Sequence, residues 1–314
     1  MDNAGTASVD MARSLAGAAR RRPPRYPSPM NYRHAFHAGN HADVLKHFVL
    51  LALCDALVAK PAPLFALDTH AGRGLYRLSG ASAQRTGEAD DGIGRLIAET
   101  PRDPLLRRYL DAVAACRKAH GADAYPGSPW LLAHALREAD RIACCETQPE
   151  EAKALAASLA GDRRVRVHPG DGYAAVRAML PPRDGATRLG RGLVLVDPPY
   201  ETQLAEFDDA LGAIREGLRR FPQGVFALWY PIKLRRTLMP FQRRAADLPG
   251  KSVLLAELMV RPDDSPLRMN GSGMLVVNPP WQLDAALAPA LASLAAALGE
   301  RGAGSRIHWL RTPS

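Results

Sequence analysis

The sequence predicts an α/β fold, in which a doubly wound and mostly parallel sheet is covered by crossover helices. Two observations support this prediction. Seven short apolar segments of strand length follow one another along the chain, and segments of helical character stand between them. With 314 residues, the chain has room for one large domain of this kind and a modest insertion. Repeated alternation of strand and helix is typical of parallel strands that are joined by crossover helices.

The elements are expected in a definite order. A helix at residues 41–60, which we expect to be amphipathic, follows Gly39 and Asn40, and Asn40 is a suitable N-cap. Strands are expected at residues 64–68, 141–146, 165–168, 193–197, 224–229, 253–260 and 274–278. Helices between and after them are expected at residues 128–140, 149–160, 172–180, 205–220 and 283–299.

Two parts of the chain do not fit this simple alternation. The interval between the first two strands is too long for one crossover, and it holds a helical stretch at 103–119, so we predict a small helical insertion at about residues 80–126. Residues 1–29 carry five arginines against two aspartates and no continuous apolar run, which predicts a disordered basic leader. One folded domain would then span residues 30–314, and Met30 is a candidate initiator.

The composition favours an anionic partner. The formal net charge is +9 and the sequence pI is near 9.7, and a basic surface attracts a phosphate backbone at long range. A merely alkaline protein is the plainer alternative. Paired basic residues at 107–108, 117–118, 235–236 and 243–244 are candidate phosphate contacts or solvated helix faces. No apolar run reaches the length of a membrane span, and four cysteines without CxxC spacing fit reduced thiols in the cytoplasm.

The strongest chemical signal is an apolar strand that ends in Asp197-Pro198-Pro199-Tyr200. An amino group conjugated to a base ring is a poor nucleophile because its lone pair is delocalised. The carboxylate of Asp197 and the carbonyl of Pro198 can accept hydrogen bonds from that amine and free its lone pair for attack on a methyl group. Asp197 can take the departing proton, and Tyr200 offers a stacking face for an extruded base. The plainer interpretation is a rigid turn after a core strand.

A second segment of the same type, Asn278-Pro279-Pro280-Trp281, ends the last apolar strand. This segment comes after six predicted strands, whereas a catalytic motif of this type normally ends the fourth strand. We therefore assign the chemistry to Asp197. Asn278 and Trp281 then belong to a structural strand end or to the rim of the substrate site.

A nucleoside site is expected at the carboxyl ends of the first three strands. The first strand leads into an acidic and glycine-containing turn with His70, which lets the backbone approach a ligand. Glu146 ends the second strand, where a carboxylate can bind both ribose hydroxyls. Asp171 and Gly172 follow the third strand, where they can read an adenine edge. Each acid alone would more often be a surface residue, and their order along the chain is the informative feature.

The stretch from Tyr32 to His47 is dense in histidine. The spacing of His34, His37 and His41 raises metal binding as an alternative, but no cysteine accompanies them and Gly39-Asn40 is expected to break the helix between them. We prefer a segment that faces cofactor and RNA, with Lys46 and His47 on its first helical turns.

Together these residues resemble one family closely, the bacterial RlmJ type of 23S rRNA adenine-N6 methyltransferase. The resemblance spans nearly all of residues 30–314. It rests on the segments MNYRH (30–34), HAGNHADVLKH (37–47), LDTHAG (67–72), RTGE (85–88), YPGSP (125–129), DPPYE (197–201), ALWYP (227–231), SGM (272–274) and NPPW (278–281). HAGNHADVLKH and YPGSP are specific to this family, whereas DPPY is shared with many amino methyltransferases. Arg73 and the pair Cys144-Cys145 depart from its usual residues.

The resemblance implies a Rossmann-like class I fold with a seven-stranded, mostly parallel sheet and a small helical insertion. It implies methyl transfer from S-adenosylmethionine to the exocyclic N6 of one adenine in 23S rRNA, as naked or early-assembly RNA. The catalytic residues would be Asp197, Pro198, Tyr200 and Lys46, and Tyr32, His34 and Tyr200 would contact the target base. Cofactor contacts would come from Lys46, His47, His70, Ser128, Glu146, Asp171, Gly172 and Asp197. A cytoplasmic monomer without metal or membrane is expected.

Two alternatives stay open. A DNA adenine-N6 methyltransferase would use the same chemistry, but it usually needs an added domain to read base edges, and little of the chain after Tyr200 is left unassigned to the sheet. A non-catalytic RNA-binding ribosome assembly factor could share the fold, but it would not need an acceptor that activates an amine.

Overall fold

The structure is a computed structural model, and it describes residues 37–79, 87–200, 203–266 and 269–313. The contacts within the chain divide it into the units Met1–Tyr32 and Arg33–Ser314, and all described residues belong to the second unit. The expected leader at residues 1–29 and the expected substrate residues Tyr32 and His34 lie outside the described residues.

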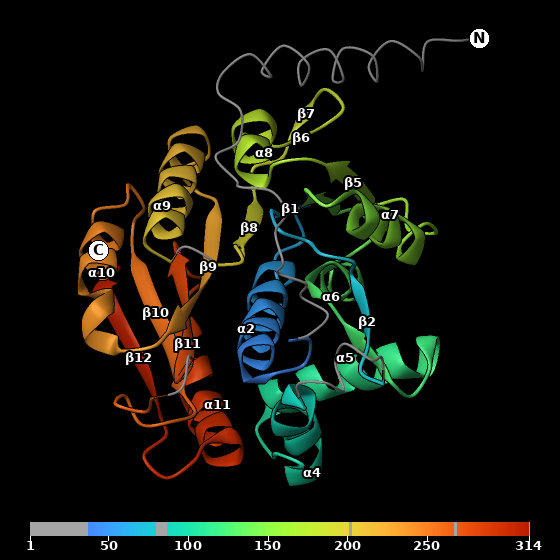
Figure 1. The fold of residues 1–314 in the computed structure, drawn as a ribbon. Helices are drawn as coiled ribbons and strands as arrows, with labels where there is room; N and C mark the ends of the chain where they lie inside the picture. The colour runs from blue at the N-terminus through green and yellow to red at the C-terminus, as the bar shows by residue number, and fades with distance from the viewer. Residues whose placement is uncertain (1–36, 80–86, 201–202, 267–268, 314) are drawn as a thin grey trace. The chain divides into compact units, whose positions relative to one another are not determined.

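An eight-stranded sheet forms the centre of the second unit, in the order β12-β10-β11-β9-β8-β1-β4-β5 (Figure 1). The five strands from β9 to β5 run parallel, while β11 is antiparallel to β9 and β10, and β12 is antiparallel to β10. The strands are β1 (Phe65–Asp68), β4 (Arg141–Glu146), β5 (Val165–Pro169), β8 (Gly192–Val196), β9 (Val225–Ile232), β10 (Val253–Met259), β11 (Gly271–Val277) and β12 (Gly304–Arg311). The predicted α/β class with a mostly parallel sheet is confirmed.

The predicted count of seven strands is wrong, because β12 (Gly304–Arg311) adds an eighth. This strand pairs on one side only, with β10, and all of its residues are half-buried. An edge strand need not be apolar along its length, and here Arg306 and His308 interrupt the apolar residues. A search for apolar runs therefore passes over it.

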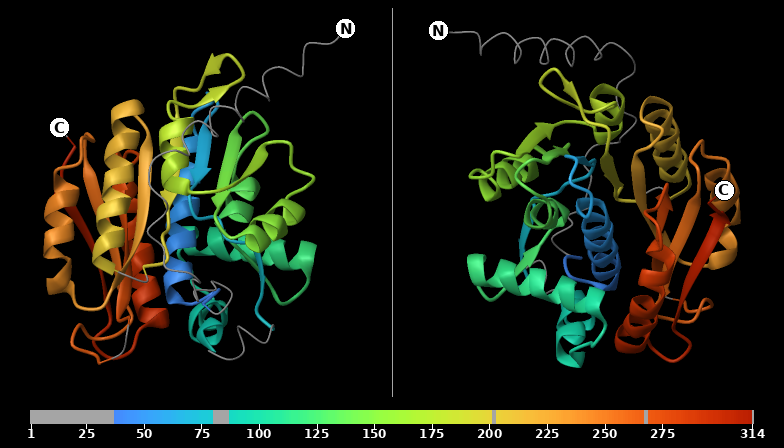
Figure 2. Two further views of the ribbon diagram at one scale, coloured as in Figure 1. Left: turned by 45° about the horizontal axis from the view of Figure 1, so that its top comes forward. Right: turned by 180° about the vertical axis from the view of Figure 1, so that it is seen from behind.

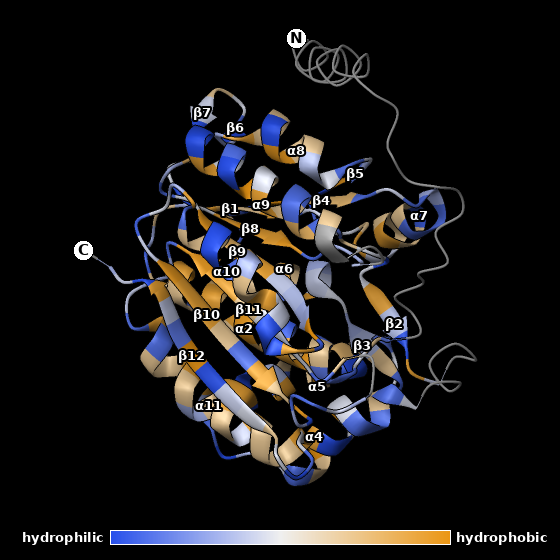
Figure 3. Ribbon diagram, turned by 60° about the vertical axis from the view of Figure 1, so that its left-hand side comes forward, coloured by the Kyte–Doolittle hydropathy of each residue, from blue (hydrophilic) through white to orange (hydrophobic). Residues whose placement is uncertain are grey.

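Helices cover both faces of the sheet, as expected of a doubly wound fold (Figures 1 and 2). One apolar cluster joins the sheet to α2, α5, α6, α7 and α11, and a second joins its other face to α8, α9 and α10. The strands β8 and β10 are mainly hydrophobic in Figure 3. The helices are α2 (His41–Val58), α5 (Pro104–His120), α6 (Ser128–Ala135), α7 (Pro149–Ser158), α8 (Gly172–Met179), α9 (Gln203–Arg220), α10 (Met239–Ala246) and α11 (Leu283–Leu298).

Helix α2 (His41–Val58) begins as predicted but is not amphipathic. The side chain of Asn40 caps it by accepting hydrogen bonds from the amides of Ala42 and Asp43, both at 3.0 Å. Every residue from 42 to 54 is buried, because the helix packs against the sheet as well as against α5, α6 and α11. A charged side chain in this stretch, such as Lys46, must therefore find its partners inside the protein.

The segment between β1 and β4, where the sequence predicts an insertion, contains helices and a two-stranded sheet. Its elements are β2 (Leu75–Arg77), the π-helix η3 (Asp90–Gly94), α4 (Arg95–Glu99), α5 (Pro104–His120) and β3 (Ala124–Pro126). The amide of Ile93 donates to the Gly39 carbonyl at 2.8 Å, and a Cβ atom on Gly92 would collide with the same oxygen. The π-helix is thus fixed to the turn that begins α2.

None of the helices in the described ranges is long and apolar enough to cross a membrane.

Candidate active site

The carboxyl ends of the parallel strands bring most of the expected site residues to one edge of the sheet. β1 ends at Asp68 and β4 at Glu146, while Asp197 follows β8 directly and Asp171 follows β5. In a parallel sheet these ends share one edge, which is where ligands bind in open α/β folds.

Lys46 and Asp197 form a buried ion pair at this edge. The Lys46 Nζ lies 2.6 Å from the Asp197 Oδ2 and 2.8 Å from the Asp43 Oδ1. The Lys46 side chain is 4% exposed and that of Asp197 is 11% exposed. Burial opposes the charged ammonium, but the carboxylates of Asp197 and Asp43 outweigh it and raise the pKa of Lys46 well above its ordinary value. Lys46 is therefore a cation at neutral pH.

Asp43 is a buried partner of Lys46 that was not singled out from the sequence. Its Oδ1 contacts Lys46, and its Oδ2 accepts a hydrogen bond from the Gly39 amide at 3.0 Å. The side chain is 3% exposed, so it is held on both sides. The signal was present in the sequence, because residues three apart on a helix share one face and can form an ion pair.

Ser128 is tied to the end of β1. Its hydroxyl donates to the Asp68 Oδ2 at 2.6 Å, and the His70 amide lies 3.3 Å from the Asp68 Oδ1. Asp68 is fully buried, and this burial raises the pKa of its carboxyl to about 7, against the lowering effect of the Ser128 hydrogen bond. The sequence pattern predicts that the first strand ends at Asp68, and it gives this residue no role of its own.

Glu146 holds the turn after β1. One carboxylate oxygen accepts from the Gly72 amide at 2.9 Å and the other from the Gln148 amide at 2.7 Å. Gly72 has a φ of 57°, a conformation that strongly favours glycine. The Oε1 also accepts a long hydrogen bond of 3.5 Å from the Thr147 hydroxyl, so the Oε2 is the oxygen with a lone pair left for a further hydroxyl group.

Asp171 and Gly172 begin helix α8. The Asp171 side chain is exposed and caps the helix by accepting from the Tyr173 amide at 2.8 Å. A Cβ atom on Gly172 would collide with the Thr69 carbonyl oxygen, so only glycine lets α8 approach the turn after β1. His70 in that turn contacts the Tyr173 ring edge-on at 5.1 Å, and burial lowers the pKa of His70 to about 4. Its imidazole is neutral at neutral pH.

Two expected site residues have buried partners of their own. The His47 Nδ1 lies 2.9 Å from the Tyr125 hydroxyl, which lies 2.9 Å from the Tyr109 hydroxyl, and His47 is 1% exposed. Its contact with the cofactor stays a prediction. Tyr200, which has a φ of 52°, donates from its hydroxyl to the Trp229 carbonyl at 2.8 Å and is 7% exposed. Stacking of a base on Tyr200 also stays a prediction.

Asn278 lies at the opposite edge of the sheet, because β11 runs antiparallel to β9. Its side chain accepts from the Lys251 amide at 2.7 Å and donates to the carbonyls of Pro222 and Gly224 at 2.9 and 2.8 Å. The second NPP-aromatic segment is therefore a structural strand end, remote from the edge that carries Asp197.

No cluster of three or more histidine, cysteine, aspartate or glutamate side chains that could hold a metal ion occurs within the ranges that the structure describes. His34, one member of the histidine set considered above, is outside those ranges.

Comparisons with known proteins identify the family. The model of the family described as ribosomal RNA large subunit methyltransferase D, RlmJ, matches residues 61–311, which is most of the chain. The chain belongs to the RlmJ family. This confirms the resemblance seen in the sequence and the prediction of a methyltransferase.

The RlmJ relatives cover almost the whole chain. The ribosomal RNA large subunit methyltransferase J of Haemophilus influenzae is 39% identical over 284 residues, which are 90% of this chain and 99% of that protein. The protein of the same name from Escherichia coli is 38% identical over 285 residues, with the same coverage. A crystal structure of a Legionella pneumophila protein matches with a TM-score of 0.77 and 28% identity, covering 87% of this chain and 98% of that chain.

Proposed function

We propose that this chain transfers the methyl group of S-adenosylmethionine to the exocyclic N6 of a single adenine in 23S ribosomal RNA. The observation that carries the proposal is the buried pair of Asp197 and Lys46 beside the glycine turns of a methyltransferase fold. The names of the RlmJ relatives support ribosomal RNA as the substrate. We expect protein-free or early-assembly RNA to be used, because a base is extruded at least cost where it is unpaired.

The residues at the strand ends fit a nucleoside cofactor. Gly172 lets the start of α8 lie directly against the turn after β1, and the exposed carboxylate of Asp171 stands next to that contact. The Glu146 Oε2 keeps a lone pair for one ribose hydroxyl, and a second hydroxyl can replace the long Thr147 contact at the Oε1. The neutral imidazole of His70 adds no positive charge that would repel a cationic ligand. When bound, S-adenosylmethionine supplies an electrophilic methyl group on its sulfonium.

Asp197 is the acceptor for the substrate amine. Its Oδ2 is occupied by the Lys46 ammonium, which leaves the Oδ1 for an amino hydrogen of the adenine. Hydrogen bonds from the amine to this oxygen and to the Pro198 carbonyl localise the nitrogen lone pair and orient it for attack. The proton lost from the amine passes to Asp197 and then to solvent. Lys46 cannot take that proton, because its pKa is raised and it is already protonated.

Substitution of Asp197 tests this proposal. We expect Asp197→Ala to lower the rate of methyl transfer to protein-free 23S rRNA at least about a hundredfold, which is the usual size of such electrostatic and acid–base contributions. RNA binding should be retained. Asp209→Ala, which removes an exposed aspartate on α9, is the matched control and should retain wild-type rates. If Asp197→Ala changes no activity, a non-catalytic assembly factor becomes the better account.

A further inference from the structure

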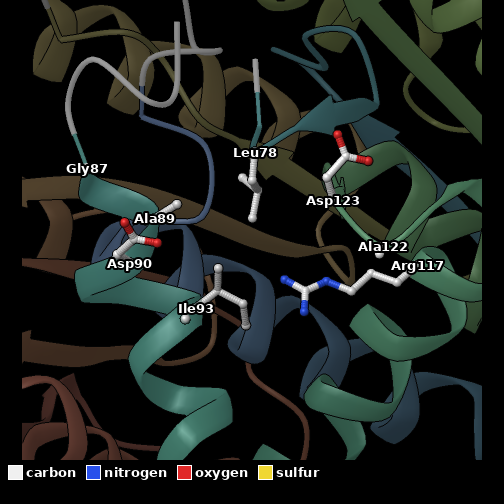
Figure 4. Close-up of a pocket in the computed structure, with 9 residues that line it drawn as sticks. Leu78, Gly87, Ala89, Asp90, Ile93, Arg117, Ala122 and Asp123 are labelled. Carbon is white, nitrogen blue, oxygen red and sulfur yellow. The ribbon is translucent and has the colours of Figure 1, made fainter. Parts of the chain in front are cut away.

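A cavity of about 330 Å³ lies in the segment between β1 and β4 (Figure 4). Its walls come from the residue after β2, from η3 and the residues before it, from α5 and from the residues before β3. They include no residue of the strand ends that carry Asp197. Leu78, Ala89 and Ile93 make its apolar surface. This volume is at the lower end of the range for ligand pockets and is large enough for one nucleobase.

Arg117 extends its guanidinium into the cavity from the end of α5 (Figure 4). The side chain is half-buried, and its Nε is fully covered without a hydrogen-bond partner. Within the described part of the chain no carboxylate forms an ion pair with it. A buried donor without a partner costs about 1–3 kcal/mol, so this Nε favours an acceptor in the cavity, either water or a ligand.

Asp90 lies on the opposite side of the same cavity, on the π-helix η3 (Figure 4). Its carboxylate has no partner among the described residues, whereas the other acid of the cavity, Asp123, is bound to Arg77 at 2.7 Å and to Ser79. The cavity therefore presents one unpaired cation and one unpaired carboxylate across an apolar surface. π-helices of one turn are often found at functional sites.

This combination fits a base better than a phosphate. A phosphate group would be repelled by Asp90 and Asp123, whereas a flat ring can lie on the apolar surface. Arginine bonded to O6 and N7 is the commonest specific contact to guanine, and a carboxylate can accept from the N1 and N2 hydrogens of the same base. We propose that this cavity binds one unpaired guanine of the RNA substrate, as a second recognition site beside the target adenine.

The cavity is connected to the catalytic helix. Ile93 lines the cavity, and its amide is bonded to Gly39 in the turn that begins α2, the helix of Lys46. Glu88 adds a second link, since it accepts from the Asn40 side chain at 2.9 Å. A base held in the cavity is thus recognised by an element that is fixed to the active site. The inference rests on the proposed function, because it assumes an RNA substrate.

The test compares Arg117→Ala and Asp90→Asn with Lys118→Ala, which removes an exposed positive charge next to Arg117 but outside the cavity. The dissociation constant for protein-free 23S rRNA is measured over a series of salt concentrations. We expect Arg117→Ala and Asp90→Asn each to weaken binding about tenfold, the usual effect of losing a base contact, with the maximal methylation rate and cofactor affinity unchanged. Lys118→Ala should weaken binding less than threefold.

Two results distinguish a bound base from a bound phosphate: the salt dependence of RNA binding by Arg117→Ala, and the direction in which Asp90→Asn changes the dissociation constant. Loss of a phosphate contact reduces the salt slope by about 0.7–0.9, whereas loss of a base contact leaves it unchanged. One guanine should also be protected from kethoxal, which attacks N1 and N2, by the wild type and not by Arg117→Ala.

The proposal is overturned if Asp90→Asn tightens binding, if Arg117→Ala reduces the salt slope, or if both variants bind like the wild type. If the wild type does not methylate rRNA at all, the proposed function fails instead.

Discussion

At the scale of single residues, the central feature is a lysine held between two carboxylates. Asp197 stands at the edge of the sheet where a substrate amine would arrive, whereas Asp43 is fixed on its far side by the Gly39 amide. When the amine engages Asp197, the Lys46 ammonium still has a buried counter-ion. We interpret Asp43 as a positioning residue that keeps Lys46 charged and in place.

Asp43→Asn tests this role. We expect a fall in kcat of about ten- to a hundredfold, the equivalent of one charge-assisted hydrogen bond, with little change in KM for RNA. Because the Asp43 carboxylate raises the pKa of Lys46, its removal should move the alkaline limb of the kcat profile to lower pH. Asp55→Asn, on the same helix but half-exposed beside Arg108, is the control. An unshifted pH profile for Asp43→Asn would argue for a structural role alone.

Asp68 should make stability depend on pH. Burial raises the pKa of its carboxyl to about 7, so ionisation of this group favours the unfolded chain, and its favourable contribution below pH 4 is lost as the pH rises through 7. Asp68→Asn removes the charge and keeps the acceptor for Ser128, while the long bond of 3.3 Å from the His70 amide is lost. We expect it to raise the free energy of unfolding of the cofactor-free protein by up to about 4 kcal/mol at pH 8, and by less at pH 5. Urea titrations at both pH values measure this, and an equal difference at the two values would refute it.

At the scale of elements, the site depends on close approach between the start of α8 and the turn after β1. Gly172→Ala would place a Cβ against the Thr69 carbonyl. We expect a loss of stability of about 1–3 kcal/mol and cofactor binding weakened at least tenfold, measured by calorimetry. Gly212→Ala, on an exposed face of α9 with open space around the added atom, should leave cofactor binding unchanged. Wild-type affinity in Gly172→Ala would show that α8 can move without harm to the site.

The sequence was a good guide where an element is apolar and begins or ends with a clear signal. The buried strands β1, β4 and β8 and the Asn40 cap of α2 belong to this class. The sequence was a poor guide where contacts with distant parts of the chain determine the structure. The edge strand β12 pairs with one strand only, so it need not be apolar. Helix α2 is buried on all sides because the insertion and α11 cover the face that was expected to meet water. The π-helix η3 likewise depends on its contact with Gly39.

The site residues also fall into two groups, those whose position the sequence predicts and those whose contacts only the fold defines. Asp197, Glu146 and Asp171 could be predicted because strand order brings their positions to one edge. The pairing of Asp43 with Lys46 was within reach of the sequence, because the two residues are three apart on one helix. The bond from Ser128 to Asp68 could not be predicted, because it joins residues 60 apart in the sequence through side-chain directions that only the packed fold defines. The same is true of Asn278, whose motif resembles that of Asp197 and whose opposite placement follows from one antiparallel strand.

At the scale of the whole molecule, the fold and the net charge are both consistent with a methyltransferase that acts on a nucleic acid. The net charge of +9 favours a nucleic acid, and the sheet places the acceptor Asp197 and the expected cofactor residues along one edge. The described residues after β8 are used mainly to complete and cover the sheet, with β9 to β12 and α9 to α11. This leaves little of the described chain for a separate domain that reads duplex DNA, so RNA is the preferred polymer.

The most direct measurement is to identify the methylated nucleoside and the polymer that carries it. The wild-type protein is incubated with methyl-labelled S-adenosylmethionine and either protein-free 23S rRNA or duplex DNA, and the products are digested to nucleosides. We predict one N6-methyladenosine in each rRNA molecule and no label in DNA. Label in duplex DNA, or on a ring nitrogen or another base of the RNA, would contradict the assignment of Asp197 as the acceptor for an adenine amine in ribosomal RNA.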